Sequence, residues 1–98
     1  MLYRLSQIAK IVGGRLVGCD LEVRSVATDS RSYAMAANTL FVAMSGVNHD
    51  AHDHISEVVE RGVKAFMVER EIVLGEGCGA VVVENSLVAL QSLATHHR

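Results

Sequence analysis

The apolar residues of this chain follow two patterns, one with helical spacing and one of short continuous runs. Leu5, Ile8 and Val12 recur at the spacing of one helix face near the amino terminus. Ser6 is the expected N-cap of that helix, and the glycine pair at 13–14 is its expected end. The first element of the chain is therefore predicted to be a short amphipathic helix.

Continuous apolar runs dominate the rest of the chain and are typical of strands that are covered on both faces of a sheet. Between two of them, a helix is expected to start at 52–53 and to end at 61–62, with Ile55, Val58 and Val59 facing inward. The runs predicted to form buried strands are 40–44, 64–68 and 80–83.

Shorter stretches complete the pattern. Segments 15–17 and 21–27 are expected to be short strands, and the glycine-rich segment 75–79 is expected to be a turn. Ser86 is the expected N-cap of a last helix, and four apolar residues are predicted to share its inward face: Leu87, Leu90, Leu93 and Ala94. Strands that alternate with helices indicate an α/β fold in one domain that covers residues 1–98.

Composition narrows the classes of function. The chain has 98 residues, a net charge of -2 and no Trp, and half of it is apolar. No basic stripe offers a footprint for nucleic acid, and no apolar run approaches the ~20 residues of a membrane span. Cys19 and Cys78 lie far apart in the sequence and form no Cys-x-x-Cys motif, so both are expected to be reduced. The expected location is the cytoplasm, without partners among nucleic acids or membranes.

The histidine-rich segment 49–54 contains three imidazoles and two carboxylates, which raises the hypothesis of a metal-dependent hydrolase. The competing interpretation is a loop that leads into a helix, with Asp50 and Asp53 near the positive end of the helix dipole. The spacing fits known metal signatures only loosely, so no metal ligand and no catalytic residue is assigned. The chain also contains no Gly-x-x-x-x-Gly-Lys-Ser/Thr motif and hence no ATP site of that type.

A polar turn between two expected strands is the strongest candidate for ligand binding. Asp29, Ser30 and Arg31 could form a plain turn, because Asp and Ser initiate turns well. In a binding site, a hydroxyl and turn amides can contact the edge of a planar base, and an arginine can meet a phosphate. Both interpretations stay open on these residues alone.

Several motifs in order resemble the amino-terminal domain of the Mur ligases, over nearly the whole chain. The resemblance is greatest to the branch that adds D-alanyl-D-alanine to UDP-N-acetylmuramoyl-tripeptide, and the branch that adds the third peptide residue is close behind. The motifs are Leu5-Ser6-Gln7-Ile8-Ala9, Gly13-Gly14, Thr28-Asp29-Ser30-Arg31, Leu40-Phe41-Val42-Ala43, Gly46 and Asp50-Ala51-His52-Asp53.

The resemblance implies a three-layer α/β/α sandwich with a mixed, largely parallel sheet, which binds the uridine diphosphate end of the peptidoglycan precursor. It implies these contact residues: Thr28, Ser30, Arg31, Gly46, Val47, Asn48 and His49. ATP, Mg²⁺ and the amide-forming chemistry are implied for central and carboxy-terminal domains that are absent from this chain, so the fragment itself is expected to bind without catalysing and to need no cofactor.

Two further expectations accompany the resemblance. The loop 32–39 is similar in length to that of domains fused to alanine racemase, which would add pyridoxal phosphate to the parent protein. The alternative to substrate binding is a non-catalytic ligand-sensing module, because similar three-layer domains occur as regulatory parts of kinases.

Overall fold

The computed structural model describes residues 3–27, 38–43, 55–70 and 75–97. Within these ranges the chain forms strands and three helices, with a helix between β1 and β2, between β5 and β6, and after β7. In chain order the elements are β1 (Tyr3–Arg4), α1 (Leu5–Val12), β2 (Arg15–Gly18), β3 (Glu22–Val23), β4 (Ser25–Ala27), β5 (Thr39–Val42), α2 (Ile55–Glu60), β6 (Ala65–Val68), β7 (Gly79–Val82) and α3 (Ser86–His97).

Helix α1 forms where the apolar spacing predicts it, but its N-cap differs from the expectation. The Oε1 atom of Gln7 accepts a 2.8 Å hydrogen bond from the backbone N–H of Arg4, which is the N-cap. Ser6 is a residue of the helix, and its backbone N–H and hydroxyl both donate to the carboxylate of Asp20. Gly13 ends the helix as expected, in a left-handed conformation with φ of 71° that glycine adopts without strain.

The main sheet has the strand order β2-β7-β6-β5-β4. Strands β4, β5, β6 and β7 are parallel, whereas β2 pairs antiparallel with β7 at one edge. Every residue of β5 and β6 is buried, in agreement with the continuous apolar runs. At the amino ends of β4 and β5, the hydroxyls of Ser25 and Thr39 lie 2.9 Å apart and hydrogen-bond across the pair. The mixed, largely parallel sheet predicted from the sequence is confirmed.

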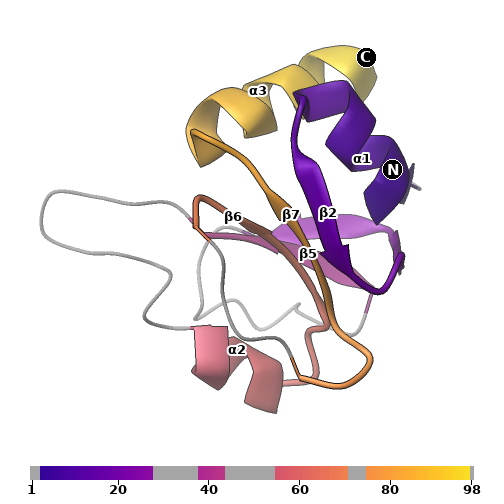
Figure 1. Ribbon diagram of the computed structural model, residues 1–98, viewed down its shortest axis with the longest axis vertical. Helices are drawn as coiled ribbons and strands as arrows, with labels where there is room; N and C mark the ends of the chain where they lie inside the picture. Colours follow the sequence, from indigo (N-terminus) through magenta and orange to yellow (C-terminus); the bar gives the residue numbers. More distant parts are fainter. Residues whose placement is uncertain (1–2, 28–37, 44–54, 71–74, 98) are drawn as a thin grey trace, which may run out of the picture.

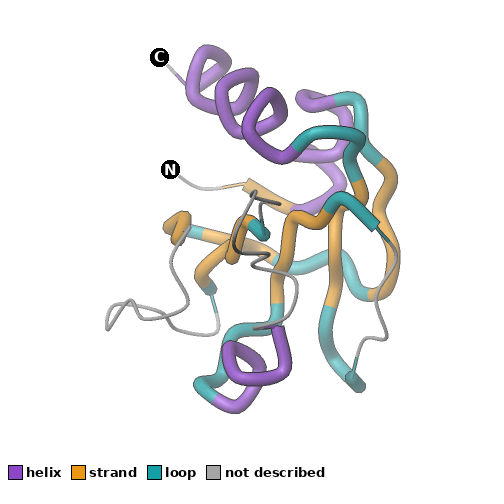
Figure 2. The backbone as a smooth tube through the Cα atoms, turned by 90° about the vertical axis from the view of Figure 1, so that its left-hand side faces the viewer, coloured by secondary structure: helices purple, strands orange, loops and turns teal. Residues whose placement is uncertain are grey.

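Helices cover both faces of this sheet, so the molecule has three layers. Helices α1 and α3 lie together on one face and α2 lies on the other, as Figure 1 and the turned view in Figure 2 show. The core is divided accordingly: Leu5, Ile8 and Leu93 pack in one apolar cluster, and Val58 packs in a second, with Phe66. The expected α/β/α sandwich is thus the observed architecture.

The second core cluster contains the largest side chains of the sheet. Phe41 and Phe66 come from the neighbouring strands β5 and β6, and their ring centroids lie 6.5 Å apart at an interplanar angle of 78°. Such an edge-to-face pair contributes about 0.5–1.5 kcal/mol beyond the burial of its area. The aromatic pair therefore anchors the side of the sheet that faces α2.

Two predicted helix faces need correction. Val59 was expected inward but is 38% exposed, and Leu87 was expected on the inward face of α3 but is 53% exposed. On α3 the buried positions are Ser86, Ala89 and Leu93, which repeat at intervals of three and four residues. Ala94 is likewise exposed. A small polar residue, Ser86, thus occupies a place on the inward face that an apolar pattern does not reveal.

A small two-stranded ribbon lies beside the main sheet and was not expected as a separate unit. Strand β1 pairs antiparallel with β3, with Tyr3 opposite Val23 and Arg4 opposite Glu22. The backbone N–H of Leu5 donates a 2.9 Å hydrogen bond to the carbonyl of Leu21 and extends this pairing into the start of α1. The ribbon therefore fixes the amino terminus of α1 relative to the sheet.

Candidate functional site

The carboxyl ends of the four parallel strands lie side by side at one end of the sheet, which we call the strand edge. Strands β4 and β5 are neighbours, with Ala27 opposite Phe41, and β6 and β7 continue the same edge. In open α/β sheets, ligands bind in the crevice outside the carboxyl ends of the strands. This edge is therefore the candidate functional site of the molecule.

The residues that sequence analysis assigned to ligand binding all follow β4 or β5 in the chain. Ala27, the last residue of β4, directly precedes Thr28, and Ala43 follows β5 three positions before Gly46. The two polar segments thus start from neighbouring strands at one edge, as expected. The assigned residues themselves lie outside the described part of the structure: Thr28, Ser30, Arg31, Gly46, Val47, Asn48 and His49.

Ser86 joins three strand ends at this edge. Its side chain is fully buried, and its Oγ donates a 2.7 Å hydrogen bond to the carbonyl oxygen of Ala43, just after β5. Its backbone N–H donates a 2.7 Å hydrogen bond to Oε2 of Glu69, the residue after β6. Since Ser86 itself follows β7, the three central strands are connected at their carboxyl ends by one residue. Sequence analysis expected only an N-cap here and missed this role.

The amino end of α3 also lies at this edge, and its polar groups are engaged within the protein. Asn85, rather than Ser86, is the N-cap: its Oδ1 accepts a 3.1 Å hydrogen bond from the N–H of Val88. The carboxylate of Glu69 accepts the hydrogen bond from the N–H of Ser86, and its negative charge lies at the positive end of the helix dipole. An anionic ligand at this helix end would have to displace Glu69.

Backbone hydrogen bonds connect neighbouring strands at this edge. The N–H of Ala43 donates a 2.8 Å hydrogen bond to the carbonyl of Met67, and the N–H of Val83 donates one of the same length to the carbonyl of Val68. Within the described residues, every buried side-chain nitrogen and oxygen atom has a hydrogen-bond partner. The edge therefore offers a rigid base from which the segments after β4 and β5 depart.

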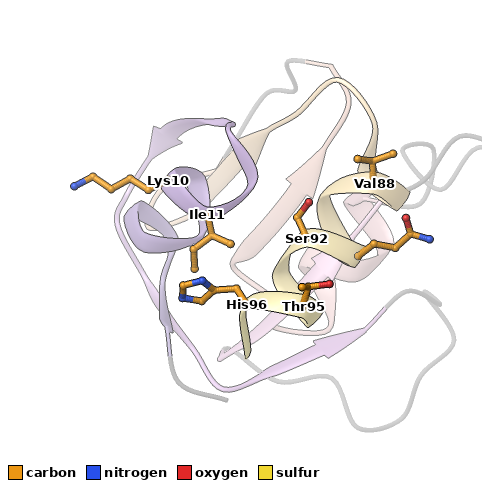
Figure 3. A pocket seen from close by; sticks show the side chains of 7 residues that line it. Lys10, Ile11, Val88, Ser92, Thr95 and His96 are labelled. Carbon is orange, nitrogen blue, oxygen red and sulfur yellow. The ribbon is translucent and has the colours of Figure 1, made fainter. Parts of the chain in front are cut away.

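A groove lies on the outer side of the molecule, between α1 and α3 (Figure 3). It has a volume of about 680 Å³, and all of its lining residues belong to these two helices. They are Lys10, Ile11, Val88, Gln91, Ser92, Thr95 and His96. The ring of His96 also lies beside Tyr3, with centroids 6.2 Å apart. This groove contains no residue from the strand ends and no cluster of acidic groups that would resemble a catalytic centre.

The carboxyl group of Asp20 has a lowered pKa, and it accepts hydrogen bonds from the first turn of α1. Hydrogen bonds from the backbone N–H and then from the hydroxyl of Ser6 lower the pKa of Asp20 below its usual value, and the charge of Arg4 acts in the same direction. Partial loss of hydration at Asp20 opposes this shift in pKa. Asp20 is therefore a capping group of the helix and not part of the strand edge.

The described residues contain no group of three or more His, Cys, Asp and Glu side chains that could hold a metal ion. The histidine-rich segment 49–54, which prompted the hydrolase hypothesis, lies outside the described residues. No helix in the described ranges is long and apolar enough to cross a lipid bilayer.

Comparison with known proteins finds related ligases. No family model matches the chain. The chain is 37% identical over 68 residues to the UDP-N-acetylmuramoyl-tripeptide--D-alanyl-D-alanine ligase of Escherichia coli, a match that covers 69% of this chain and 15% of that enzyme. It is 31% identical over 98 residues to the UDP-N-acetylmuramoyl-L-alanyl-D-glutamate--2,6-diaminopimelate ligase of Cytophaga hutchinsonii, covering 98% of this chain and 19% of that enzyme.

Solved structures agree with these sequence matches. A crystal structure of MurF from Acinetobacter baumannii superposes on 98% of this chain with a TM-score of 0.84 and 25% identity, and the match covers 21% of that protein. MurF from Thermotoga maritima, solved in complex with ADP, superposes on 76% of this chain with a TM-score of 0.62 and 30% identity, over 16% of its own length. The chain thus spans about a fifth, or less, of the relatives it matches.

Proposed function

Because this chain is a relative of the Mur ligases in sequence and in structure, we propose that it is the substrate-holding domain of a longer ligase of that family. By name, the relatives are ligases that act on UDP-N-acetylmuramoyl peptides. The similarity to MurF extends over 98% of this chain, and that observation carries the proposal. The domain corresponds in this proposal to the amino-terminal domain of the parent enzyme.

The ligand in this proposal is the uridine diphosphate end of UDP-N-acetylmuramoyl-tripeptide. Thr28 and Ser30, after β4, contact the uracil and ribose, and Arg31 meets the diphosphate. Gly46 lets the chain after β5 come close to the nucleotide, where Val47, Asn48 and His49 add further contacts. Support comes from the neighbouring, parallel strand ends at Ala27 and Val42, which start both segments at one edge.

The geometry of α3 supports placing the diphosphate on these segments. The first turn of α3 lies at the strand edge, and the N–H groups of a first helix turn have no partner within the helix. Two of these groups already donate hydrogen bonds, to Glu69 and to Asn85. A negatively charged diphosphate would meet the carboxylate of Glu69 there, which is unfavourable. Arg31 and the backbone amides after β4 and β5 are the better phosphate partners.

The chemical step belongs in this proposal to the parts of the parent that the chain does not contain. The family's reaction joins D-alanyl-D-alanine to the tripeptide with ATP and Mg²⁺, and this chain has no Gly-x-x-x-x-Gly-Lys-Ser/Thr loop for ATP. The fragment accordingly binds and positions the substrate, and the parent acts in the cytoplasm. The fusion to an alanine racemase stays a prediction without support from the names of the relatives.

Titration calorimetry on the 98-residue chain tests the binding. We expect UDP-N-acetylmuramoyl-tripeptide and UDP to bind with measurable heat, and ADP and GDP to bind more weakly. Ser30→Ala should weaken UDP binding by about threefold to tenfold, the range expected for one lost hydrogen bond. Ser92→Ala is the matched control, because Ser92 is an exposed serine of α3 that lines the groove between α1 and α3. Equal affinity for the three nucleotides would instead favour a sensing module.

The MurE branch is the second candidate, because a diaminopimelate ligase matches 98% of this chain at 31% identity. The substrate-holding role would be the same, and only the added amino acid would differ. Phosphate release by the full-length parent separates the branches. Release that depends on D-alanyl-D-alanine identifies MurF, whereas release that depends on diaminopimelate or lysine identifies MurE.

A further inference from the structure

Cys19 and Cys78, far apart in the sequence, lie opposite each other where β2 and β7 pair. The antiparallel register ends with Gly18 opposite Gly79, and Cys19 and Cys78 are the residues directly beyond that last pair. The backbone N–H of Cys19 donates a 3.0 Å hydrogen bond to the carbonyl of Cys78 and so continues the pairing. The reciprocal bond of a full antiparallel pair is absent, because the N–H of Cys78 donates a 3.2 Å hydrogen bond to the carbonyl of Gly75. The single bond from Cys19 still holds the two backbones side by side, and disulfides join Cα atoms that lie about 4.4–6.8 Å apart.

The two thiols differ sharply in access to solvent. Both cysteines are free, Cys19 is exposed, and Cys78 is only 6% exposed at the end of the core cluster that faces α2. The backbones are in close contact here, since the carbonyl of Cys19 lies directly over Gly79. A dissolved reagent therefore reaches Cys19 first, and Cys78 is the neighbour that can resolve the product. An exposed thiol beside a second cysteine is the arrangement found in redox-sensing pairs.

We propose that Cys19 and Cys78 form a redox-responsive pair that closes into a disulfide when low-molecular-weight disulfides such as oxidised glutathione accumulate. In the first step the sulfur of Cys19 attacks oxidised glutathione and loses its proton. The reagent's S–S bond breaks, a Cys19–glutathione disulfide forms, and one glutathione thiol leaves with the proton.

In the second step the sulfur of Cys78 attacks the sulfur of Cys19 and loses its own proton. The Cys19–Cys78 bond forms, and a second glutathione thiol leaves. Two protein thiols are oxidised in total, and one oxidised glutathione is reduced to two thiols. The crosslink ties the edge strand β2 to β7 and encloses β3 to β6 in one loop. Closing so long a loop restricts the unfolded chain, so the oxidised protein should unfold at a higher temperature than the reduced protein.

Treatment of the purified 98-residue chain with oxidised glutathione tests this pair. We expect a monomer that has lost both free thiols, whose intact mass is lower by two hydrogen atoms, and which dithiothreitol restores. Cys78→Ala should stop at the first step and keep one glutathione on Cys19. Cys19→Ser should not react while it is folded, because its remaining thiol is buried. Circular dichroism of both variants verifies that they fold.

Two results would overturn the proposal. One is that the unsubstituted 98-residue chain keeps glutathione on Cys19 while Cys78 stays free, which would mean that the two sulfur atoms cannot form a bond. The other is a disulfide-linked dimer through Cys19. Both results are independent of nucleotide binding, so the proposed function and this pair succeed or fail separately.

Discussion

The hydroxyl of Ser86 donates a 2.7 Å hydrogen bond to the carbonyl oxygen of Ala43, a residue 43 positions earlier in the chain. Ala43 is the last described residue after β5, and the segment that follows it carries Gly46 and Asn48 of the proposed nucleotide site. The position at which this segment leaves the sheet is therefore set by the first residue of α3. A residue of the last helix thereby supports the start of the segment that we propose to bind the nucleotide, near the middle of the sequence.

Replacement of this hydroxyl should destabilise the protein. Ser86→Ala leaves the buried carbonyl of Ala43 without that donor, and we expect the free energy of unfolding to fall by about 1–3 kcal/mol. Urea unfolding measures the change. Ser92→Ala removes an exposed hydroxyl of the same helix and should change the free energy by less than about 0.5 kcal/mol. Equal losses in both variants would contradict the role of the Ser86 bond.

The N-cap of α3 can be tested separately. Asn85→Ala removes the acceptor for the N–H of Val88, and an N-cap replaced by alanine costs about 1 kcal/mol of stability. Asn85→Ser keeps a capping oxygen and should retain most of that free energy. Thermal unfolding of the two variants makes the comparison. If Asn85→Ala and Asn85→Ser have the same melting temperature, Asn85 is not the N-cap of α3.

The capping carboxylate of α1 predicts a dependence of stability on pH. Because the folded state lowers the pKa of Asp20 below its ordinary value of 3.8, the stabilisation is complete above that value and is lost as the pH falls through the lower folded pKa. Asp20→Asn should remove this acid-side dependence. Ser6→Ala removes one of the two hydrogen bonds, so the pKa of Asp20 should rise part of the way towards its ordinary value. Titration of the carboxyl carbon by NMR reports both effects.

Gly79 should tolerate no side chain. A Cβ atom there would overlap the backbone carbonyl of Cys19 and lie 2.9 Å from Cδ1 of Leu5. Since a backbone group cannot move aside cheaply, Gly79→Ala should lower the free energy of unfolding by about 1–3 kcal/mol or more. At Gly75 a Cβ atom would meet nothing within 4 Å, so Gly75→Ala is the control and should leave stability nearly unchanged. Chemical unfolding of the pair distinguishes close contact from a general effect of alanine.

Local patterns predicted the elements because the relevant forces act over a few residues. The apolar run at 40–44 became the buried strand Thr39–Val42, and the glycine at 13 ended α1 as expected. The inward faces of α2 and α3 were harder to assign. Leu87 and Val59 are apolar yet exposed, because a helix buries only the side that a sheet happens to cover. The assigned nucleotide contacts stay predictions, since their residues lie outside the described ranges.

The sequence by itself determined the class of fold, the buried strands that follow from continuous apolar runs, and the two polar segments after β4 and β5. Only the tertiary structure decided that β2 pairs antiparallel with β7, that the hydroxyl of Ser86 bonds to the carbonyl of Ala43, and that the N–H of Cys19 bonds to the carbonyl of Cys78. The physical reason is distance along the chain. Helix spacing and strand burial are encoded in neighbouring residues, whereas pairings between distant residues depend on how all the layers pack together at once.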